Sequence, residues 1–208
     1  MVQYAFHVDS SVCTGCKTCQ IACQDKNDLA VDILWRKVYQ YGGGGWVDKG
    51  NGIMVPTEVF RYFLSIACNH CENPTCVEAC PTGAMQKDAD TGIVWTDHEE
   101  CIACESCSKA CPYDAPKLDT ENGYMTKCDF CKDQLSEDGK PECVAACNQR
   151  ALDWGPLDDL LKKYPDFVDG VEPLPEPTTN PSLLITAHPK ARLSGEGGGA
   201  ILNMEYEL

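Results

Sequence analysis

Cysteine most constrains what this chain can fold into, because sixteen cysteines stand among its 208 residues. This density is typical either of a disulfide scaffold or of a protein that binds metal through thiolates. The cysteines fall into four sets of four, with none left over. The sets are Cys13, Cys16, Cys19 and Cys23; Cys68, Cys71, Cys76 and Cys80; Cys101, Cys104, Cys107 and Cys111; and Cys128, Cys131, Cys143 and Cys147.

A disulfide framework is typical of small secreted domains. The chain begins MVQYAFHVDSS, without the basic and apolar regions of a signal peptide, so we expect it to be synthesised and folded in a reducing cytoplasm. No apolar run approaches the roughly 18 residues of a membrane span, and we expect no direct span. A formal charge of −15 argues against nucleic-acid binding, which depends on Lys and Arg neutralising phosphates.

The first and third sets have the spacing C-x2-C-x2-C-x3-C, as CTGCKTCQIAC and CIACESCSKACP. Bacterial ferredoxins hold cubane [4Fe-4S] clusters with this spacing, and their fourth cysteine ligates the other cluster of a pair. A tight loop can wrap three thiolates around one cube. Two cysteines at positions i and i+4 share one face of a helical turn, from which their sulfurs can reach neighbouring cubes.

The second and fourth sets lengthen the middle spacing but keep both end elements. The second reads CNHCENPTCVEACP, and the fourth reads CDFC followed by CVAAC after an 11-residue gap. Two close cysteine pairs also suit a tetrahedral structural zinc site, so zinc is the alternative for the fourth set. Three cubane sets beside it favour a fourth [4Fe-4S] cluster.

The pairing of the sets follows from what comes after them. The second and third end in Cys-Pro, at Pro81 and Pro112, and 20 residues separate Cys80 from Cys101, as in a two-cluster ferredoxin. We infer one module nested inside another; the alternative is a tandem pairing of the first set with the second. The inferred ligand groups are Cys13, Cys16, Cys19 and Cys147 for cluster 1; Cys128, Cys131, Cys143 and Cys23 for cluster 2; Cys68, Cys71, Cys76 and Cys111 for cluster 3; and Cys101, Cys104, Cys107 and Cys80 for cluster 4.

We therefore expect an α+β fold of two nested bacterial-ferredoxin-like modules, each holding two [4Fe-4S] clusters. Residues 1–55 and 123–165 form the outer module and residues 56–122 the inner one. A β-containing insert is expected between Cys23 and Cys68, with strands over 36–41 and 55–65 around a glycine loop, Gly42 to Gly45, that covers a cluster. A short helix is expected in GPLDDLLKKY. Residues 166–208 are expected to form an extended C-terminal tail, whose apolar Leu183 to Ile185 segment lies along a partner.

Other residues carry weaker signals. His70 and His98 could hydrogen-bond a cluster sulfur, but solvated loop histidines are the simpler interpretation. The four tryptophans, Trp35, Trp46, Trp95 and Trp154, are expected to pack as hydrophobic lids. We find no nucleophile-base pair, Walker loop or dinucleotide fingerprint, so we expect no catalytic residue and no other cofactor.

Five segments also carry a family likeness: HVDSSVCTGCKTCQIAC, RYFLSIACNHCENPTCVEACPTGAM, CIACESCSKACPYDAP, GYMTKCDFC and ALDWGPLDDL. They resemble the iron-sulfur B subunit of respiratory dimethyl sulfoxide reductase-type molybdopterin oxidoreductases, over about Tyr4 to Pro175. Asn148 stands where the family usually has proline, and residues after Lys190 fall outside the resemblance. Some relatives lack the second cysteine of the third set; Cys104 is present here, so four irons are expected in every cube.

The resemblance implies a non-catalytic electron-transfer subunit for anaerobic respiration. Its partners would be a large molybdopterin catalytic subunit and usually a quinol-oxidising membrane anchor, which would place the chain at the membrane. Export with a catalytic subunit that bears a twin-arginine signal is a further implication. Two alternatives stay open: a freestanding soluble polyferredoxin, and a structural zinc module without a reducible centre.

Overall fold

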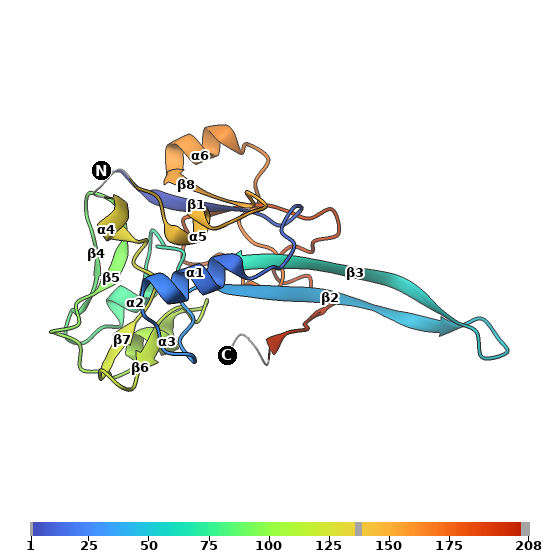
Figure 1. Cartoon of the computed structure of the whole chain (residues 1–208), viewed down its shortest axis with the longest axis horizontal. Helices are drawn as coiled ribbons and strands as arrows, with labels where there is room; N and C mark the ends of the chain where they lie inside the picture. The colour runs from blue at the N-terminus through green and yellow to red at the C-terminus, as the bar shows by residue number, and fades with distance from the viewer. Residues whose placement is uncertain (1, 136–138, 205–208) are drawn as a thin grey trace.

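The computed structural model describes residues 2–135 and 139–204 as small sheets and short helices (Figure 1). The strands are β1 Tyr4–Asp9, β2 Lys37–Asp48, β3 Met54–Ile66, β4 Met85–Lys87, β5 Val94–Thr96, β6 Lys117–Asp119, β7 Tyr124–Thr126, β8 Leu152–Pro156, β9 Leu183–Thr186 and β10 Ala200–Ile201. The helices are α1 Thr18–Lys26, α2 Thr75–Glu78, α3 Ser106–Ala110, α4 Lys132–Leu135, α5 Glu142–Ala145 and α6 Leu157–Lys163. The expected mixture of helices and strands is confirmed. Within the described ranges, no helix has the length and apolarity to span a bilayer.

Four of the short helices pack in two pairs that join distant parts of the sequence. α1 packs against α5, and α2 packs against α3. Beside the first pair, β1 runs antiparallel to β8, from Tyr4 opposite Pro156 to Val8 opposite Leu152. Near the second pair lie two hairpins, β4 with β5 and β6 with β7. The first cysteine set therefore lies with the fourth, and the second with the third.

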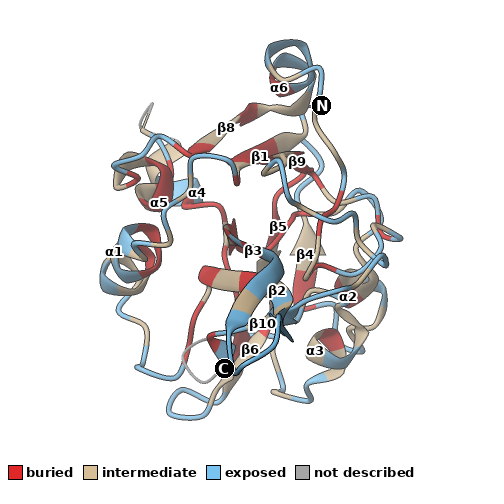
Figure 2. Ribbon diagram, turned by 90° about the vertical axis from the view of Figure 1, so that its right-hand side faces the viewer, coloured by how far each residue is buried: buried red, intermediate tan, exposed pale blue. Residues whose placement is uncertain are grey.

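Cysteines form part of the apolar interior. Phe6 of β1 and Phe130 stack at the centre with ring centroids 4.1 Å apart. The same buried group contains cysteines of three sets: Cys19, Cys68, Cys128, Cys143 and Cys147. Figure 2 shows this buried interior between the β1–β8–β9 sheet and the short helices.

The insert forms one long hairpin in which β2 pairs with β3 from Lys37 opposite Ile66 to Asp48 opposite Met54. The expectation that the glycine run forms the loop is wrong, because these glycines lie inside β2. Gly44 sits at a bulge with φ +106°, where a β-carbon would lie 2.6 Å from the Cα of Val59. Only glycine tolerates this backbone conformation and this close approach. The far half of the hairpin extends away from the body (Figure 1), and Trp46 on it is 66% exposed, so Trp46 is not a lid.

The C-terminal segment is packed onto this chain. β9 pairs in parallel with β1, with Phe6 opposite Leu183 and Val8 opposite Ile185, and β10 pairs with β2. Leu183, Leu184 and Ile185 are all buried. The expectation that this apolar segment lies along a partner is wrong. Its backbone pairs with β1, and its apolar side chains are buried within this chain. The Pro- and Gly-rich sequence on either side therefore gives no sign of this four-residue strand, three residues of which are buried.

The short helix expected after the last cysteine is confirmed as α6, Leu157–Lys163. Pro156 precedes the helix as its N-cap residue. Asp158 and Asp159 lie in the first turn and Lys162 and Lys163 in the last, an arrangement that complements the helix dipole.

Replacing Ile185 by Ala tests whether the C-terminal segment belongs to the core. We expect the stability of the anaerobically purified chain to fall by about 2–5 kcal/mol, the cost of an Ile→Ala cavity in a packed interior. Thermal unfolding followed by circular dichroism would measure this. The matched control is Ile53→Ala at the exposed hairpin turn, which should change little. Equal effects of the two substitutions would show that β9 contributes nothing to the isolated chain.

Candidate metal centres

Two loops with identical cysteine spacing have the same backbone shape. In the first loop Gly15 and Lys17 have positive φ, and in the third loop Ala103 and Glu105 have positive φ at the equivalent positions. These left-handed residues turn the chain sharply enough to bring three cysteines around one space. Gly15 has a second reason to be glycine, because a β-carbon there would lie 2.3 Å from the ring of Phe63.

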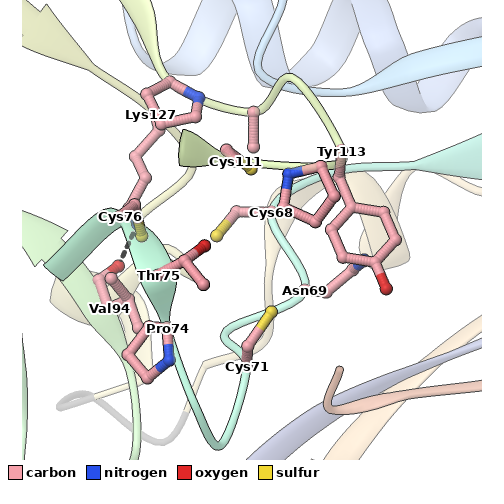
Figure 3. A pocket seen from close by; sticks show the side chains of 13 residues that line it. Cys68, Asn69, Cys71, Pro74, Thr75, Cys76, Val94, Cys111, Tyr113 and Lys127 are labelled. Atoms are coloured by element: carbon pink, nitrogen blue, oxygen red, sulfur yellow. Dashed lines mark hydrogen bonds between the residues drawn. The ribbon is translucent and has the colours of Figure 1, made fainter. Parts of the chain in front are cut away.

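The first cavity, the Cys68 cavity, is lined by residues of the segments 68–76 and 111–116. Figure 3 shows cysteine side chains around it together with Thr75, Tyr113 and Lys127. Thr179, from the segment before β9, donates a hydrogen bond of 3.1 Å to the sulfur of Cys71. The cysteines that line the Cys68 cavity are Cys68, Cys71, Cys76 and Cys111.

Two further cavities have the same kind of lining. The Cys101 cavity is closed by apolar Met85 and Met125, whose backbone N–H groups donate to the sulfurs of Cys80 and Cys101. The Cys13 cavity is bounded by Val38 and Ser65 from the base of the long hairpin. The cysteines are Cys80, Cys101, Cys104 and Cys107 in the Cys101 cavity, and Cys13, Cys16, Cys19 and Cys147 in the Cys13 cavity.

The remaining four cysteines, the Cys128 group, are all buried: Cys23, Cys128, Cys131 and Cys143. Burial raises the pKa of the Cys23 thiol to about 12, and the neighbouring thiols of Cys143 and Cys131 add to the shift.

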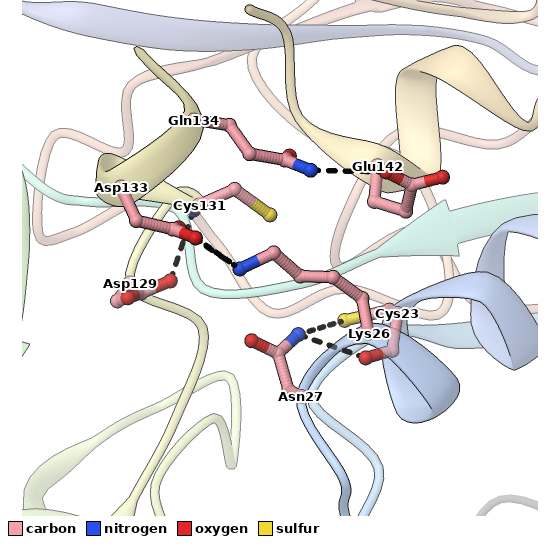
Figure 4. Close-up of polar contacts among 8 residues, drawn as sticks. All are labelled: Cys23, Lys26, Asn27, Asp129, Cys131, Asp133, Gln134 and Glu142. Atoms are coloured by element: carbon pink, nitrogen blue, oxygen red, sulfur yellow. Dashed lines mark hydrogen bonds and ion pairs between the residues drawn. The ribbon is translucent and has the colours of Figure 1, made fainter. Parts of the chain in front are cut away.

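Polar contacts surround this group (Figure 4). Lys26 of α1 forms an ion pair of 2.7 Å with Asp133 of α4. Gln134 of α4 donates to Glu142 of α5 at 3.1 Å. These contacts tie three helices together around the Cys128 group.

In every set the last two cysteines, four residues apart, belong to different groups. Cys19 lines the Cys13 cavity and Cys23 belongs to the Cys128 group, and both lie on α1. Cys76 lines the Cys68 cavity, whereas Cys80 lines the Cys101 cavity. The Cys68 thiol is also among the groups that raise the pKa of Cys128. The groups thus follow one another in space as Cys13, Cys128, Cys68 and Cys101.

The donor chemistry fits iron-sulfur clusters. Among the described side chains, no three His, Cys, Asp or Glu residues converge closely enough to hold a single metal ion. A cubane does not require such convergence, because its four thiolates bind four different irons. Burial raises the pKa of Cys13 to about 11 and that of Cys76 to about 12, so these thiols lose their protons only when a metal takes the proton's place.

The two ends of the series differ from its middle in exposure. Cys16 and Cys104 are exposed, and hydrogen bonding with Thr18 and Ser106, respectively, lowers the pKa of each thiol. Cys68 and Cys128 are buried. The series therefore reaches the protein surface at the Cys13 and Cys101 cavities.

Several residues around the groups were not found from the sequence. Ser65, Thr179 and Lys127 contact cysteines or line their cavities, and Arg36 lies near enough for cysteines to raise its pKa, but these residue types give no signal outside the cysteine motifs.

The two histidines differ from each other in their surroundings. His70 is 1% exposed, so the expectation of a solvated loop histidine is wrong for it; its Nδ1 accepts a hydrogen bond from Val94 N. Burial lowers its pKa well below the usual value, and the positive charge of Lys127 adds to the shift. His98 stacks on Tyr124 with ring centroids 3.8 Å apart.

Comparison with known proteins adds two domain matches and a set of full-length relatives. Residues 59–157 match a 4Fe-4S dicluster domain and residues 10–30 a 4Fe-4S binding domain. The chain is 47% identical to the B subunit of anaerobic dimethyl sulfoxide reductase from Escherichia coli K12, over 97% of both proteins. It is 47% identical to the subunit of the same name from Haemophilus influenzae, over 98% of both. It is 34% identical to a thiosulfate reductase electron transfer subunit of Salmonella typhi, over 76% of this chain and 78% of the other.

The similarity to these full-length relatives continues past Lys190, which corrects the expectation that residues after that position fall outside the family.

Exposure predicts which cysteines become free first when clusters are damaged. After brief air exposure of anaerobically prepared protein, we expect iodoacetamide to modify Cys16 and Cys104 before Cys68 and Cys128. The first two are exposed and have lowered thiol pKa values, so a larger fraction is in the nucleophilic thiolate form at neutral pH. Peptide mass spectrometry would give the order, with denatured protein as the reference. Early modification of Cys68 or Cys128 would contradict the assignment of surface and interior groups.

Proposed function

The chain belongs to the family of iron-sulfur B subunits of anaerobic dimethyl sulfoxide reductases, and on this premise we propose that it is an electron-transfer subunit carrying four [4Fe-4S] clusters. It would relay single electrons between a quinol-oxidising membrane anchor, or another donor, and a molybdopterin catalytic subunit. The single observation that carries this proposal is the grouping of the cysteines, four to a group, in a series that reaches the surface at both ends.

The proposed ligands are the four groups described above. A [4Fe-4S] cluster takes four cysteine thiolates, and sixteen cysteines in four groups of four supply that number without remainder. Two observations support the proposal. Four cysteines line each of three cavities, and in the Cys128 group neighbouring thiols raise the pKa values of Cys23 and Cys128, which shows that these thiols lie close together. A zinc ion in the Cys128 group is the competing proposal, and metal analysis separates the two.

Each bound cluster supplies reversible uptake of one electron, and the chain's own residues set the conditions for it. The apolar walls around the groups, such as Met85 and Met125 at the Cys101 cavity, keep water from the inner side of each group, where Cys107 is buried, while Cys104 stays exposed. Hydrogen bonds to cysteine sulfur, such as that from Thr179 to Cys71, stabilise negative charge on the ligand. Electrons would enter near one exposed cysteine, Cys16 or Cys104, and leave near the other.

We further propose that the chain consists of two nested ferredoxin-like modules, with the outer one in residues 1–55 and 123–165 and the inner one in residues 56–122. Support comes from the two helix pairs, α1 with α5 and α2 with α3. The pairing of β1 with β8 across the whole inner segment adds to it. The packed strand β9 would extend the outer module's sheet.

The proposed partners are a large catalytic subunit and a membrane anchor. The relatives are named as one subunit of a reductase or as its electron transfer subunit, which favours a role in a complex over a freestanding polyferredoxin. We propose that the chain folds in the cytoplasm and reaches the membrane through these partners, or is exported with a catalytic subunit that carries a twin-arginine signal. The proposed subunit has no active site of its own.

Purification under anaerobic, native conditions tests the proposed role. We expect the chain to co-elute with a larger molybdenum-containing subunit. The isolated chain should be reduced by dithionite and reoxidised by dyes, yet turn over neither dimethyl sulfoxide nor thiosulfate. A stable monomer without any co-eluting subunit would favour the freestanding polyferredoxin, and a colourless protein containing zinc would favour the structural module.

The substitution Cys80→Ser tests the proposed ligand groups. The wild-type chain should hold about 16 iron and 16 sulfide. Because Cys80 lines the Cys101 cavity, Cys80→Ser should change the same electron paramagnetic resonance signal as Cys104→Ser, whereas Cys71→Ser should change a different one. If Cys80→Ser and Cys71→Ser damage the same centre while that of Cys104 stays intact, each set binds its own cluster and the nested arrangement is wrong.

A further inference from the structure

Arg36, immediately before β2, has a side chain that is buried yet incompletely bonded. The residue is 2% exposed, and it is among the largest fully buried side chains of the described chain. Its Nη1 donates to Ser65, to the hydroxyl at 3.2 Å and to the backbone carbonyl at 3.4 Å. Its guanidinium lies 4.8 Å from the centroid of the Phe6 ring. Its Nε and Nη2 find no hydrogen-bond acceptor among the described residues.

A buried cation with free donors is costly unless an anion stands beside it. Arg36 forms no ion pair with any carboxylate in residues 2–135 and 139–204. Burial by itself would lower the pKa of the guanidinium, but neighbouring thiolates raise it above its usual value. These thiolates are Cys143, Cys19, Cys128 and Cys23. One belongs to the Cys13 cavity and the other three to the Cys128 group.

A hydrogen-bonded path leads from Arg36 to one of these sulfurs. The Ser65 hydroxyl accepts a hydrogen bond from Arg36 and lies 3.3 Å from the sulfur of Cys19. A hydroxyl that accepts from a cation is free to donate its own proton, here to the thiolate of Cys19. Ser65 itself lies in β3 and lines the Cys13 cavity.

Lys127, a second interior cation, is bonded differently. Its Nζ donates to two backbone carbonyls, those of Val94 and Cys128. The Lys127 ammonium is therefore held by the backbone. The guanidinium of Arg36 keeps two donor atoms, Nε and Nη2, that have no acceptor in residues 2–135 and 139–204.

We propose that Arg36 is an internal counter-charge shared by the clusters of the Cys13 cavity and the Cys128 group, directing its free N–H groups to their sulfurs and favouring their reduced states. This rests on the proposed function, because it requires clusters at both groups. The step it influences is the addition of one electron, delivered by the donor partner and passed on to the acceptor. That electron adds one negative charge to the cluster, which a fixed buried cation stabilises. Of the clusters in the proposed series, the two beside Arg36 are therefore held at higher reduction potentials than their ligands alone would give.

Redox titration of Arg36→Gln, followed by electron paramagnetic resonance, tests the proposal. Signals are first assigned with Cys16→Ser and Cys131→Ser for the two groups beside Arg36. In Arg36→Gln we expect the equilibrium constant for reduction of both clusters to fall at least tenfold, which is about 59 mV for one electron. The clusters of the Cys68 and Cys101 cavities should keep their potentials. Arg61→Gln, on an exposed position of β3, is the matched control for the loss of one positive charge and should shift none of the four.

Two further variants isolate the parts of the arrangement. Ser65→Ala should lower the potential of the Cys13-cavity cluster alone, because Cys19 is the one cysteine whose sulfur lies within hydrogen-bond distance of the Ser65 hydroxyl in the part of the chain that the structure describes. Arg36→Lys keeps the charge but loses the planar donors, and should lower both potentials by less than Arg36→Gln does.

Unchanged potentials in a fully loaded Arg36→Gln protein would overturn the proposal. If that variant does not load its clusters, Arg36→Lys and Ser65→Ala decide: unchanged potentials in both overturn the proposal, and the expected shifts support it. A wild-type chain without four reducible clusters would instead refute the proposed function, and iron analysis shows this before any titration.

Discussion

Four cysteine pairs, each with a spacing of four residues, set the arrangement of this chain. In each pair the first cysteine lies on a short helix, and the second lies on the same helix, as Cys23 does on α1, or within two residues of its end, so the two sulfurs reach two different groups. A turn that must serve two neighbouring groups has its position and direction fixed by both. The short helices therefore pack in pairs, and the small sheets close around them. Cysteines stand in the buried interior where a protein of this size would otherwise place leucine or isoleucine.

Charge is distributed unevenly between the surface and the interior. The chain has a formal charge of −15, and its sixteen thiols are not counted in that number. The interior holds the cations Arg36 and Lys127, next to cysteines. Buried thiolates in an acidic protein repel one another, and interior cations offset this repulsion where solvent does not screen it. The acidic exterior and the basic interior side chains are thus two parts of one electrostatic arrangement.

Those parts of the fold were predictable in which residue types and their spacing determine the local structure. The cysteine loops, the two strands of the insert and helix α6 follow from thiolate spacing, alternation and capping residues. The glycine run was misjudged because an isolated sequence does not show that β3 lies against Gly44. Strand β9 was missed because three apolar residues between a proline-rich and a glycine-rich stretch give no periodicity. Arg36 and Ser65 were missed because their role depends on contacts between residues 29 positions apart.

The order in which the residues are made differs from the order in which the proposed groups can be completed. All cysteines of the Cys68 and Cys101 cavities have been synthesised once residue 111 is added, whereas the Cys13 cavity also needs Cys147. At translation rates of 5–20 residues per second, Cys13 waits about 7 to 27 s for that partner. During this time β1 also lacks both of its neighbours, β8 and β9. The earliest thiols to leave the ribosome are therefore among the last to be enclosed, and the nascent chain depends on its reducing surroundings for longest at its own N-terminus.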